Sequence, residues 1–353
     1  MKRSTIFILL FLVLIAAAIL YYLWRKSEPP APGLAPSLVS LLPEDASYVF
    51  YADAAALRSS IYVQKLLAAL PSPKEDRAYA EFVRRTGFDY ARDLDRVAAA
   101  VVPTSKGDLV VAIAEGRFDR QRISEYAKNS PHLVRYRSPD TYVFSAGNSS
   151  AWPVSSSPEE FVLTFLSESR ILLAQGVAAQ QSLTFSREPP TISSNAPLNE
   201  RIARVAGSEL FAVARVPAAA GKSLLPEDWV SKEIQQALAS VRWVTLALRP
   251  EGQAARPSGE AIRIVLEAEC ESAGDARQLA WGLEGLRVLA RAALPGEDSG
   301  SGTDPALAAL VKTILKDGKI TSADRYVRLS FSLGPDFLAA LTPPPAPSKK
   351  HGR

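Results

Sequence analysis

An uncharged apolar run near the N-terminus is the feature that most constrains this chain. The segment from Thr5 to Trp24 contains no charged side chain. A helix of that length is about 30 Å long, which matches the hydrocarbon thickness of a bilayer. Aromatic residues end the run, where such rings favour the headgroup layer, and Arg25 and Lys26 follow in water. We therefore predict a transmembrane anchor within residues 1–26.

The residues expected to hold this helix in lipid are its large apolar and aromatic side chains: Ile6, Phe7, Leu10, Phe11, Leu14, Ile15, Leu20, Tyr21, Tyr22 and Trp24. A cleaved secretory signal is the alternative, because Lys2 and Arg3 precede the run and three alanines at 16–18 offer a cleavage site. The run continues past these alanines to the aromatic residues, which favours the anchor.

The basic residues at positions 2 and 3 favour a cytoplasmic N-terminus. We expect a single-pass protein of the inner (cytoplasmic) membrane, with its body outside the cytoplasm, in the periplasm of a bacterial cell. The lipid bilayer is then one partner, and a protein of the envelope is a possible second one.

The excess of basic residues lies mainly outside the predicted body. Seven of the 41 Lys and Arg residues flank the apolar run or lie in the C-terminal tail, which leaves 34; removing Glu28 from the 37 acids leaves 36. The body therefore carries a net charge near −2, and no phosphate-binding surface is indicated. We expect no nucleic-acid partner. A single cysteine allows no disulfide within the chain.

Proline-rich segments separate the predicted parts of the chain. Residues 27–40 are predicted to form a linker and 343–353 a disordered basic tail. The chain between them alternates strand and helix patterns, which predicts an α+β fold with mostly antiparallel strands, in two related sheet-and-helix units at 41–190 and 191–342.

The two predicted units share an order of strand, helix, hairpin and helix. The hairpins are "RVAAAVVP" with "DLVVAIAE" and "WVTLALRP" with "AIRIVLEAE". Equating Phe50 with Phe211 requires an offset of 161, whereas Val97 matches Val244 at 147. The long helix that begins near Asp275 is expected to bury a leucine face that includes Leu279 and Leu289.

The hexapeptide "SLLPED" occurs twice, at 40–45 and 223–228, outside these offsets. Proline followed by acids is typical of a helix start, so we interpret the two copies as local helix-start chemistry rather than as the repeat.

Metal and cofactor motifs are absent from the sequence. The two histidines, His132 and His351, have no second ligand at metal spacing, and no nucleophile elbow is present. "GKS" at 221–223 resembles the end of a phosphate loop, but Val216 replaces the required glycine. We predict no catalytic, cofactor-binding or metal residue, and no cofactor.

Cysteine and glutamate alternate along one predicted strand. Cys270 shares a face with the apolar Ile262 and Ile264 and is expected to be a core residue rather than a nucleophile. Glu267, Glu269 and Glu271 are expected to form a solvated sheet face.

Four aspartates are the remaining candidates for chemistry. Asp53 and Asp89 are placed to cap helices, and Arg92 and Arg96 are placed to neutralise Asp93 and Asp95. A pair drawn from these four could instead serve a glycan hydrolase.

The segments "LLPEDASYVFYAD" and "EFVRRTGFDYARDLDRVAAAVVP" resemble uncharacterised exported, membrane-anchored bacterial proteins of a domain-of-unknown-function family, over residues 41–123. The resemblance implies an envelope setting and brings no catalytic or ligand residue.

The expected function is a membrane-anchored binding or scaffolding protein of the bacterial envelope. The alternatives are a carboxylate-dependent hydrolase of envelope glycans and a carrier of an apolar ligand.

Overall fold

Short runs of alternating side chains build most of the described chain into strands. The computed structural model describes residues 37–60, 62–65, 77–105, 107–130, 133–138, 140–145, 160–176, 191–217, 232–251, 261–293 and 305–341. In "YVFYAD", as in its neighbours, β-branched and aromatic residues point alternately to the two faces of a sheet. The predicted transmembrane segment lies outside the described residues.

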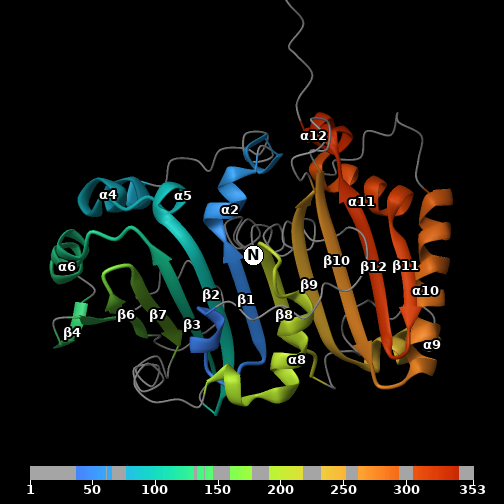
Figure 1. The fold of residues 1–353 in the computed structure, drawn as a ribbon, viewed down its shortest axis with the longest axis horizontal. Helices are drawn as coiled ribbons and strands as arrows, with labels where there is room; N and C mark the ends of the chain where they lie inside the picture. The colour runs from blue at the N-terminus through green and yellow to red at the C-terminus, as the bar shows by residue number, and fades with distance from the viewer. Residues whose placement is uncertain are drawn as a thin grey trace, which may run out of the picture.

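Twelve strands of these segments form one sheet, in the order β11-β12-β10-β9-β8-β1-β2-β3-β7-β6-β5-β4 (Figure 1). The strands are β1 Tyr48–Asp53, β2 Leu94–Thr104, β3 Gly107–Gly116, β4 Leu133–Ser138, β5 Thr141–Ser145, β6 Glu160–Ser167, β7 Arg170–Gly176, β8 Leu210–Arg215, β9 Val241–Glu251, β10 Ala261–Cys270, β11 Lys319–Ala323 and β12 Tyr326–Leu333. All eleven neighbouring pairs are antiparallel, so the predicted α+β class with antiparallel strands is confirmed.

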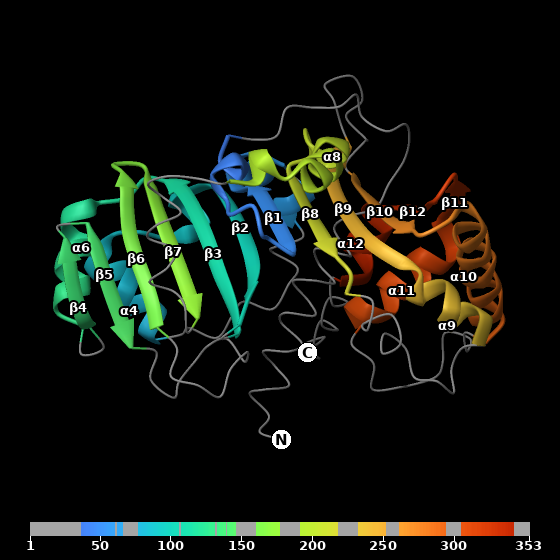
Figure 2. The same cartoon turned by 90° about the horizontal axis from the view of Figure 1, so that it is seen from below.

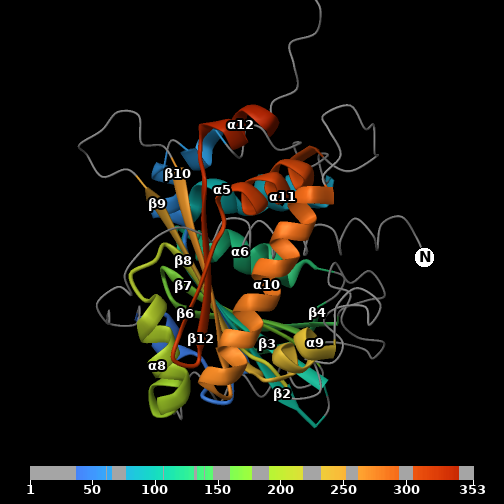
Figure 3. The ribbon, with the colours of Figure 1, turned by 90° about the vertical axis from the view of Figure 1, so that its right-hand side faces the viewer.

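Helices cover both faces of the sheet. They are α2 Ala54–Ser59, α4 Arg77–Thr86, α5 Tyr90–Asp93, α6 Arg120–Lys128, α8 Ala196–Val205, α9 Lys232–Ala239, α10 Ala273–Ala293, α11 Pro305–Asp317 and α12 Pro335–Leu341, with the 3-10 turns η1 Val39–Leu41 and η3 Ile192–Ser194. Helix α8 lies on one face, and α6, α9, α10 and α11 lie on the opposite face (Figures 2 and 3).

Each face has its own apolar core. On the α8 face, Leu198 and Ile202 pack on sheet residues that include Val49 and Phe211. On the other face, α11 and α12 cover β9, β10 and β12, and α6 covers β3, β5, β6 and β7. Both faces of the central strands are therefore removed from water, which explains why β1 and β8 are apolar at nearly every position.

The two halves of the sheet meet at the pair β1·β8. Tyr51 lies opposite Phe211 there, and the two rings stack with centroids 5.2 Å apart. On either side the order is the same: three antiparallel strands, a helix (α6 or α10), and returning strands of which one, β7 or β12, pairs with the third strand. The predicted boundary between two units at 190 and 191 stays a prediction, because one continuous sheet joins the halves.

The predicted offset of 161 between the first strands is wrong by one residue. Phe50 packs in the core beneath α11 and α12, whereas Phe211 packs beneath α8. Side chains alternate between faces along a strand, so an odd offset here exchanges the faces. The offset of 147 pairs residues on the same face of the sheet. It matches Ala100 of β2 with Ala247 of β9, and both face the core beneath α8, as does Ala98.

Two local predictions are also corrected. Ser272, not Asp275, caps the start of α10. The Ser272 hydroxyl accepts from the Asp275 amide at 3.1 Å and donates to the Asp275 carboxylate at 2.6 Å. The first SLLPED copy starts no α-helix. Its first two residues belong to η1, and the other four lie in the connection to β1. Its Glu44 carboxylate accepts from the Ser194 hydroxyl at 2.6 Å. The second copy lies outside the described residues.

Candidate functional site

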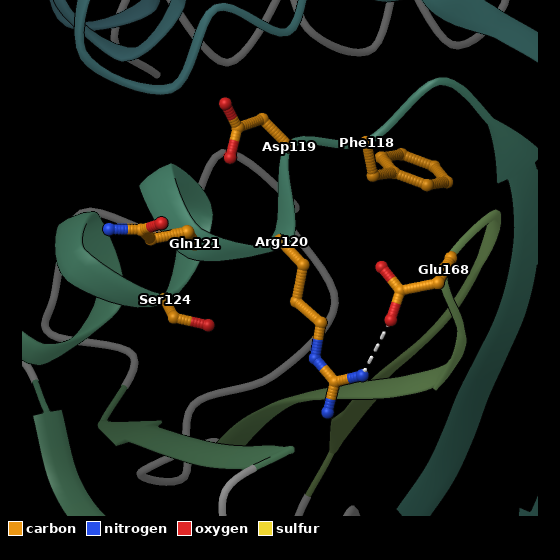
Figure 4. Close-up of a pocket in the computed structure, with 6 residues that line it drawn as sticks. All are labelled: Phe118, Asp119, Arg120, Gln121, Ser124 and Glu168. Atoms are coloured by element: carbon orange, nitrogen blue, oxygen red, sulfur yellow. Dashed lines mark hydrogen bonds and ion pairs between the residues drawn. The ribbon is translucent and has the colours of Figure 1, made fainter.

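A shallow recess lies where α6 begins, beside the turn between β6 and β7. Its volume is about 550 Å³, and it is lined by Phe118, Asp119, Arg120, Gln121, Ser124 and Glu168 (Figure 4). The helix starts here because the Asp119 carboxylate accepts from the Arg122 amide at 3.0 Å, as predicted for a capping aspartate. That bond fixes the backbone from which Arg120 and Gln121 project.

Arg120 is the central charged group of the recess. Its guanidinium donates to Glu168 Oε1 at 3.1 Å, also pairs with Asp140, and lies 5.5 Å from the centre of the Phe165 ring. Figure 4 shows the Arg120 side chain extending toward Glu168, with Gln121 and Ser124 on the helix. Glu168 is 82% exposed, so this ion pair contributes at most about 1 kcal/mol to stability.

One aromatic residue, Phe118, lines the recess. Phe118 stacks on Phe88 with ring centroids 4.9 Å apart and an interplanar angle of 28°. Arg120, Gln121, Ser124 and Glu168 add hydrogen-bond donors and acceptors to the lining of the recess. The recess can therefore hold a small polar ligand. No sequence pattern indicated it, because it brings together the start of α6 and a turn that follows three strands later in the chain.

Asp53 and Asp89 have the capping roles predicted for them. The Asp53 carboxylate accepts from the Ala56 amide at 2.8 Å at the start of α2. The Asp89 carboxylate accepts from the Ala91 amide at 2.9 Å at the start of α5 and from the Tyr79 hydroxyl at 2.9 Å. Tyr79 loses its proton less readily for this reason: burial and the Asp89 hydrogen bond raise its pKa to about 12.

Asp93 is held as an anion. Only 7% of the residue is exposed, and its carboxylate accepts from Arg92 at 2.6 Å and from the Asp89 amide at 3.0 Å. The Arg92 hydrogen bond is the main reason that the pKa of Asp93 is lowered to about 2. A carboxyl group with this pKa cannot act as a general acid near neutral pH.

Alternating charges cross four adjacent strands near this region. Arg96 of β2 donates to Asp53 of β1 at 3.3 Å and to Glu115 of β3 at 3.4 Å, and Arg170 of β7 donates to Glu115 at 3.1 Å. Each of these pairs lies directly cross-strand in the sheet register. Asp95, by contrast, pairs with Arg58 of α2 at 3.2 Å. All four predicted aspartates thus serve the fold, as caps or as partners of arginine.

The prediction of a solvated glutamate face on β10 is wrong for two of its three members. Glu267 and Glu269 are each 6% exposed. Arg204 of α8 pairs with Glu267 at 2.5 Å, and Arg201 of α8 pairs with Glu269 at 2.6 Å. The helix lies over this strand, and its two arginines, one turn apart, reach the two glutamates.

Arginines from β12 and its preceding turn complete this buried group. Arg328 donates to Glu267 at 2.7 Å, and Arg325 pairs with Glu269 at 3.0 Å. The Arg201 guanidinium lies 4.6 Å from the Trp243 ring centre, and Arg204 lies 3.9 Å from that of Tyr326. Four arginines therefore surround two glutamates. Glu271 is 54% exposed and pairs with Arg242, so the prediction is right only there.

Cys270 is a core residue, as predicted. It is 2% exposed and packs with Ala276 and Leu279 of α10. Burial raises the pKa of its thiol, which disfavours the nucleophilic thiolate. Among the described residues, no group of three or more His, Cys, Asp or Glu side chains could hold a metal ion. His132, His351 and the "GKS" segment lie outside those residues.

The described helices include none that is both long and apolar enough to cross a membrane. The ten predicted anchor residues precede the first described residue, so the anchor stays a prediction.

Fold and recess together define an α+β protein with one large antiparallel sheet and a small polar surface site. No protein-family model matches the sequence, and the search of curated proteins found no relative. The resemblance to a family of exported bacterial proteins, expected for residues 41–123, therefore stays a prediction.

Crystal structures of TP0453 resemble the chain. Crystal form III superposes with a TM-score of 0.40 and 10% identity, over 88% of this chain and 98% of that chain. Form IV gives 0.40 and 9%, over 86% and 95%, and form I gives 0.39 and 9%, over 87% and 97%. A likeness at this level says nothing about ligand, location or mechanism.

Proposed function

We propose that the chain is a membrane-anchored, extracytoplasmic protein of a bacterial cell envelope that binds a partner and catalyses no reaction. The uncharged run at 5–24 and the proline-rich linker that follows it support the location. The recess at the start of α6 supports binding, because hydrogen-bonding groups and one aromatic ring line it.

The observation that carries this proposal is the state of the carboxylates. A glycan hydrolase needs one carboxyl group with a raised pKa and a second one facing it. Asp53 and Asp89 instead accept hydrogen bonds from helix-terminal amides, Asp95 pairs with arginine, and the pKa of Asp93 is lowered to about 2. These bonds favour a binding protein over the carboxylate-dependent hydrolase.

The recess also favours a polar ligand over the apolar one that a carrier would take. Phe118 is the one apolar residue among the six that line it, and Arg120, Asp119 and Glu168 carry charge there. An apolar ligand would have to displace water from these groups without replacing its hydrogen bonds.

Photo-crosslinking at the recess tests the proposal. A photoreactive amino acid at Gln121, in the full chain in intact bacterial membranes, should give an adduct that the added change Arg120→Ala abolishes. A photoreactive amino acid at Glu81, exposed on α4, is the matched control. Adducts of equal yield at 121 and 81, or no loss on Arg120→Ala in a folded chain, would contradict a binding role for the recess.

A further inference from the structure

Helix α10 carries a second apolar surface, opposite the one it buries. Its inner side packs Ala276, Leu279 and Ala280 against the sheet. On its outer side Trp281 is 77% exposed and Leu289 67% exposed, although the leucine pattern of the sequence predicts a buried Leu289. The reason is helical geometry. Residues 279 and 289 are ten positions apart, so their side chains project about 80° apart around the helix axis.

The exposed arc of α10 is apolar at its centre and basic at its ends. Trp281 and Val288, which is 55% exposed, are seven residues apart and project within about 20° of each other. From position 277 to position 291 the exposed residues are Arg277, Trp281, Gly285, Val288, Leu289 and Arg291. We call the four between the arginines the outer α10 surface.

One carboxylate, Glu284, lies within this arc. Its side chain is 43% exposed and pairs with Arg287 at 2.5 Å, and the charge of Arg291 also acts on it. The neighbouring helix α11 extends the pattern, because Val311, Lys312 and Lys316 are exposed there and Arg291 donates to the Lys316 carbonyl. Asp317 is the exposed acid at the end of α11.

We infer that the outer α10 surface rests on the headgroup region of an anionic bilayer. Tryptophan and leucine enter this region, and arginine and lysine side chains reach its phosphates from the edges of the helix. A helix of 21 residues that lies flat offers about 30 Å of such contact. The charges around the apolar residues are mainly basic, because Arg277, Arg291, Lys312 and Lys316 outnumber Glu284 and Asp317, and this excess matches an anionic surface.

The inference rests in part on the proposed anchor, which sets the distance to the membrane. Residues 25–36 separate the predicted transmembrane helix from the first described residue, Ser37. An extended segment of that length spans at most about 40 Å, so Ser37 stays within that distance of the lipid.

A second copy of the chain fits the surface less well. In a two-fold contact each patch meets itself, so arginines at the ends of α10 would face arginines of the partner helix. The one carboxylate on this surface, Glu284, already pairs with Arg287 of its own helix. The like charges therefore oppose self-association, whereas anionic lipid satisfies them.

Lipid quenching of a fluorophore tests this inference. We would label Leu289→Cys in a Cys270→Ala background of the full chain, and reconstitute it in vesicles of phosphatidylcholine and phosphatidylglycerol that carry a shallow spin-labelled lipid. The fluorescence should fall about twofold or more, as for a probe at headgroup depth. Glu81→Cys on α4, at the opposite end of the sheet (Figure 1), should keep its fluorescence.

A double change, Trp281→Ser with Val288→Ser, should restore the fluorescence at 289, with circular dichroism showing that the helix remains. Equal quenching of labels 289 and 81 by aqueous iodide would overturn the inference. So would self-quenching at 289 that disappears when unlabelled chain is added, because a second copy would then cover the surface. An alkaline wash separates the two proposals: chain lost in the wash contradicts the anchor, whereas the fluorescence of vesicles before the wash reports on α10.

Discussion

Glu269 shows how much one buried carboxylate contributes when arginines surround it. Its side chain is 8% exposed and lies 2.6 Å from Arg201 and 3.0 Å from Arg325. Glu269→Gln removes the nearest anion from both guanidinium groups and leaves the buried Arg201 only the exposed Glu200 at 3.7 Å. The change should lower the free energy of unfolding by about 3–5 kcal/mol.

Denaturant unfolding of the purified full chain in detergent measures this change. Glu271→Gln is the matched control on the same strand, because its carboxylate is 54% exposed and its ion pair is worth at most about 1 kcal/mol. Equal losses for the two variants would show that burial does not distinguish these glutamates.

Asp93 gives a prediction of pH dependence. Its pKa falls from 3.8 to about 2 in the folded chain, so the carboxylate stabilises the fold above pH 3.8, and this contribution is lost as the pH falls through 2. Asp93→Asn should therefore be less stable than the unaltered chain at pH 7, and the difference should narrow between pH 4 and pH 2. Unfolding curves at several pH values check this, and a difference that does not vary with pH would contradict the role assigned to Asp93.

Single residues also show why some site features follow from sequence. The caps at Asp53, Asp89 and Asp119 are local, since each carboxylate bonds an amide two or three residues away. The burial of Glu267 and Glu269 depends on α8, which lies far earlier in the sequence, and no local pattern reports it. The same holds for the recess, where Glu168 approaches a helix start that precedes it by three strands.

At the scale of elements, two glycines should respond in opposite directions to alanine. Gly285 lies in the middle of α10, exposed, and an added Cβ would meet no atom within 4 Å. Gly285→Ala should stabilise the chain by about 0.5–1 kcal/mol, because alanine favours the helix. At Gly116, which ends β3, a Cβ would lie 2.4 Å from the Asp93 carbonyl oxygen. Gly116→Ala should destabilise the chain.

Thermal unfolding of the two variants beside the unaltered chain measures both effects. A loss of stability in Gly285→Ala would mean that the outer side of α10 is already in contact with something that a methyl group displaces. An unchanged melting temperature in Gly116→Ala would contradict the close approach of β3 to α5.

Elements with a strong local pattern could be predicted, and their arrangement could not. The hairpins β2–β3 and β9–β10 and the helix α8, with Pro197 in its first turn and a positive φ at Gly207 after it, match the sequence patterns. Helices α11 and α12 and strand β11 were not predicted. The pairing of β1 with β8, which joins the halves, depends on segments far apart in the sequence.

At the scale of the whole molecule, we propose a sheet of two halves that is tethered outside the membrane and rests on it through α10. The near-neutral body and the basic flanks of the apolar run both fit a tether rather than a nucleic-acid surface. Membrane attachment then has two sources: the predicted anchor, which is independent of salt, and the α10 contact, which salt should weaken.

The central claim is that the segment 1–26 stays in the membrane and holds the body outside the cytoplasm. The direct measurement is mass spectrometry of the full chain recovered from alkaline-washed bacterial membranes, combined with protease added to the outside of spheroplasts. We predict an intact N-terminus in the washed membranes and a body that the protease degrades. A chain found in the soluble fraction without the segment 1–26, or one that the protease cannot reach, would contradict the claim.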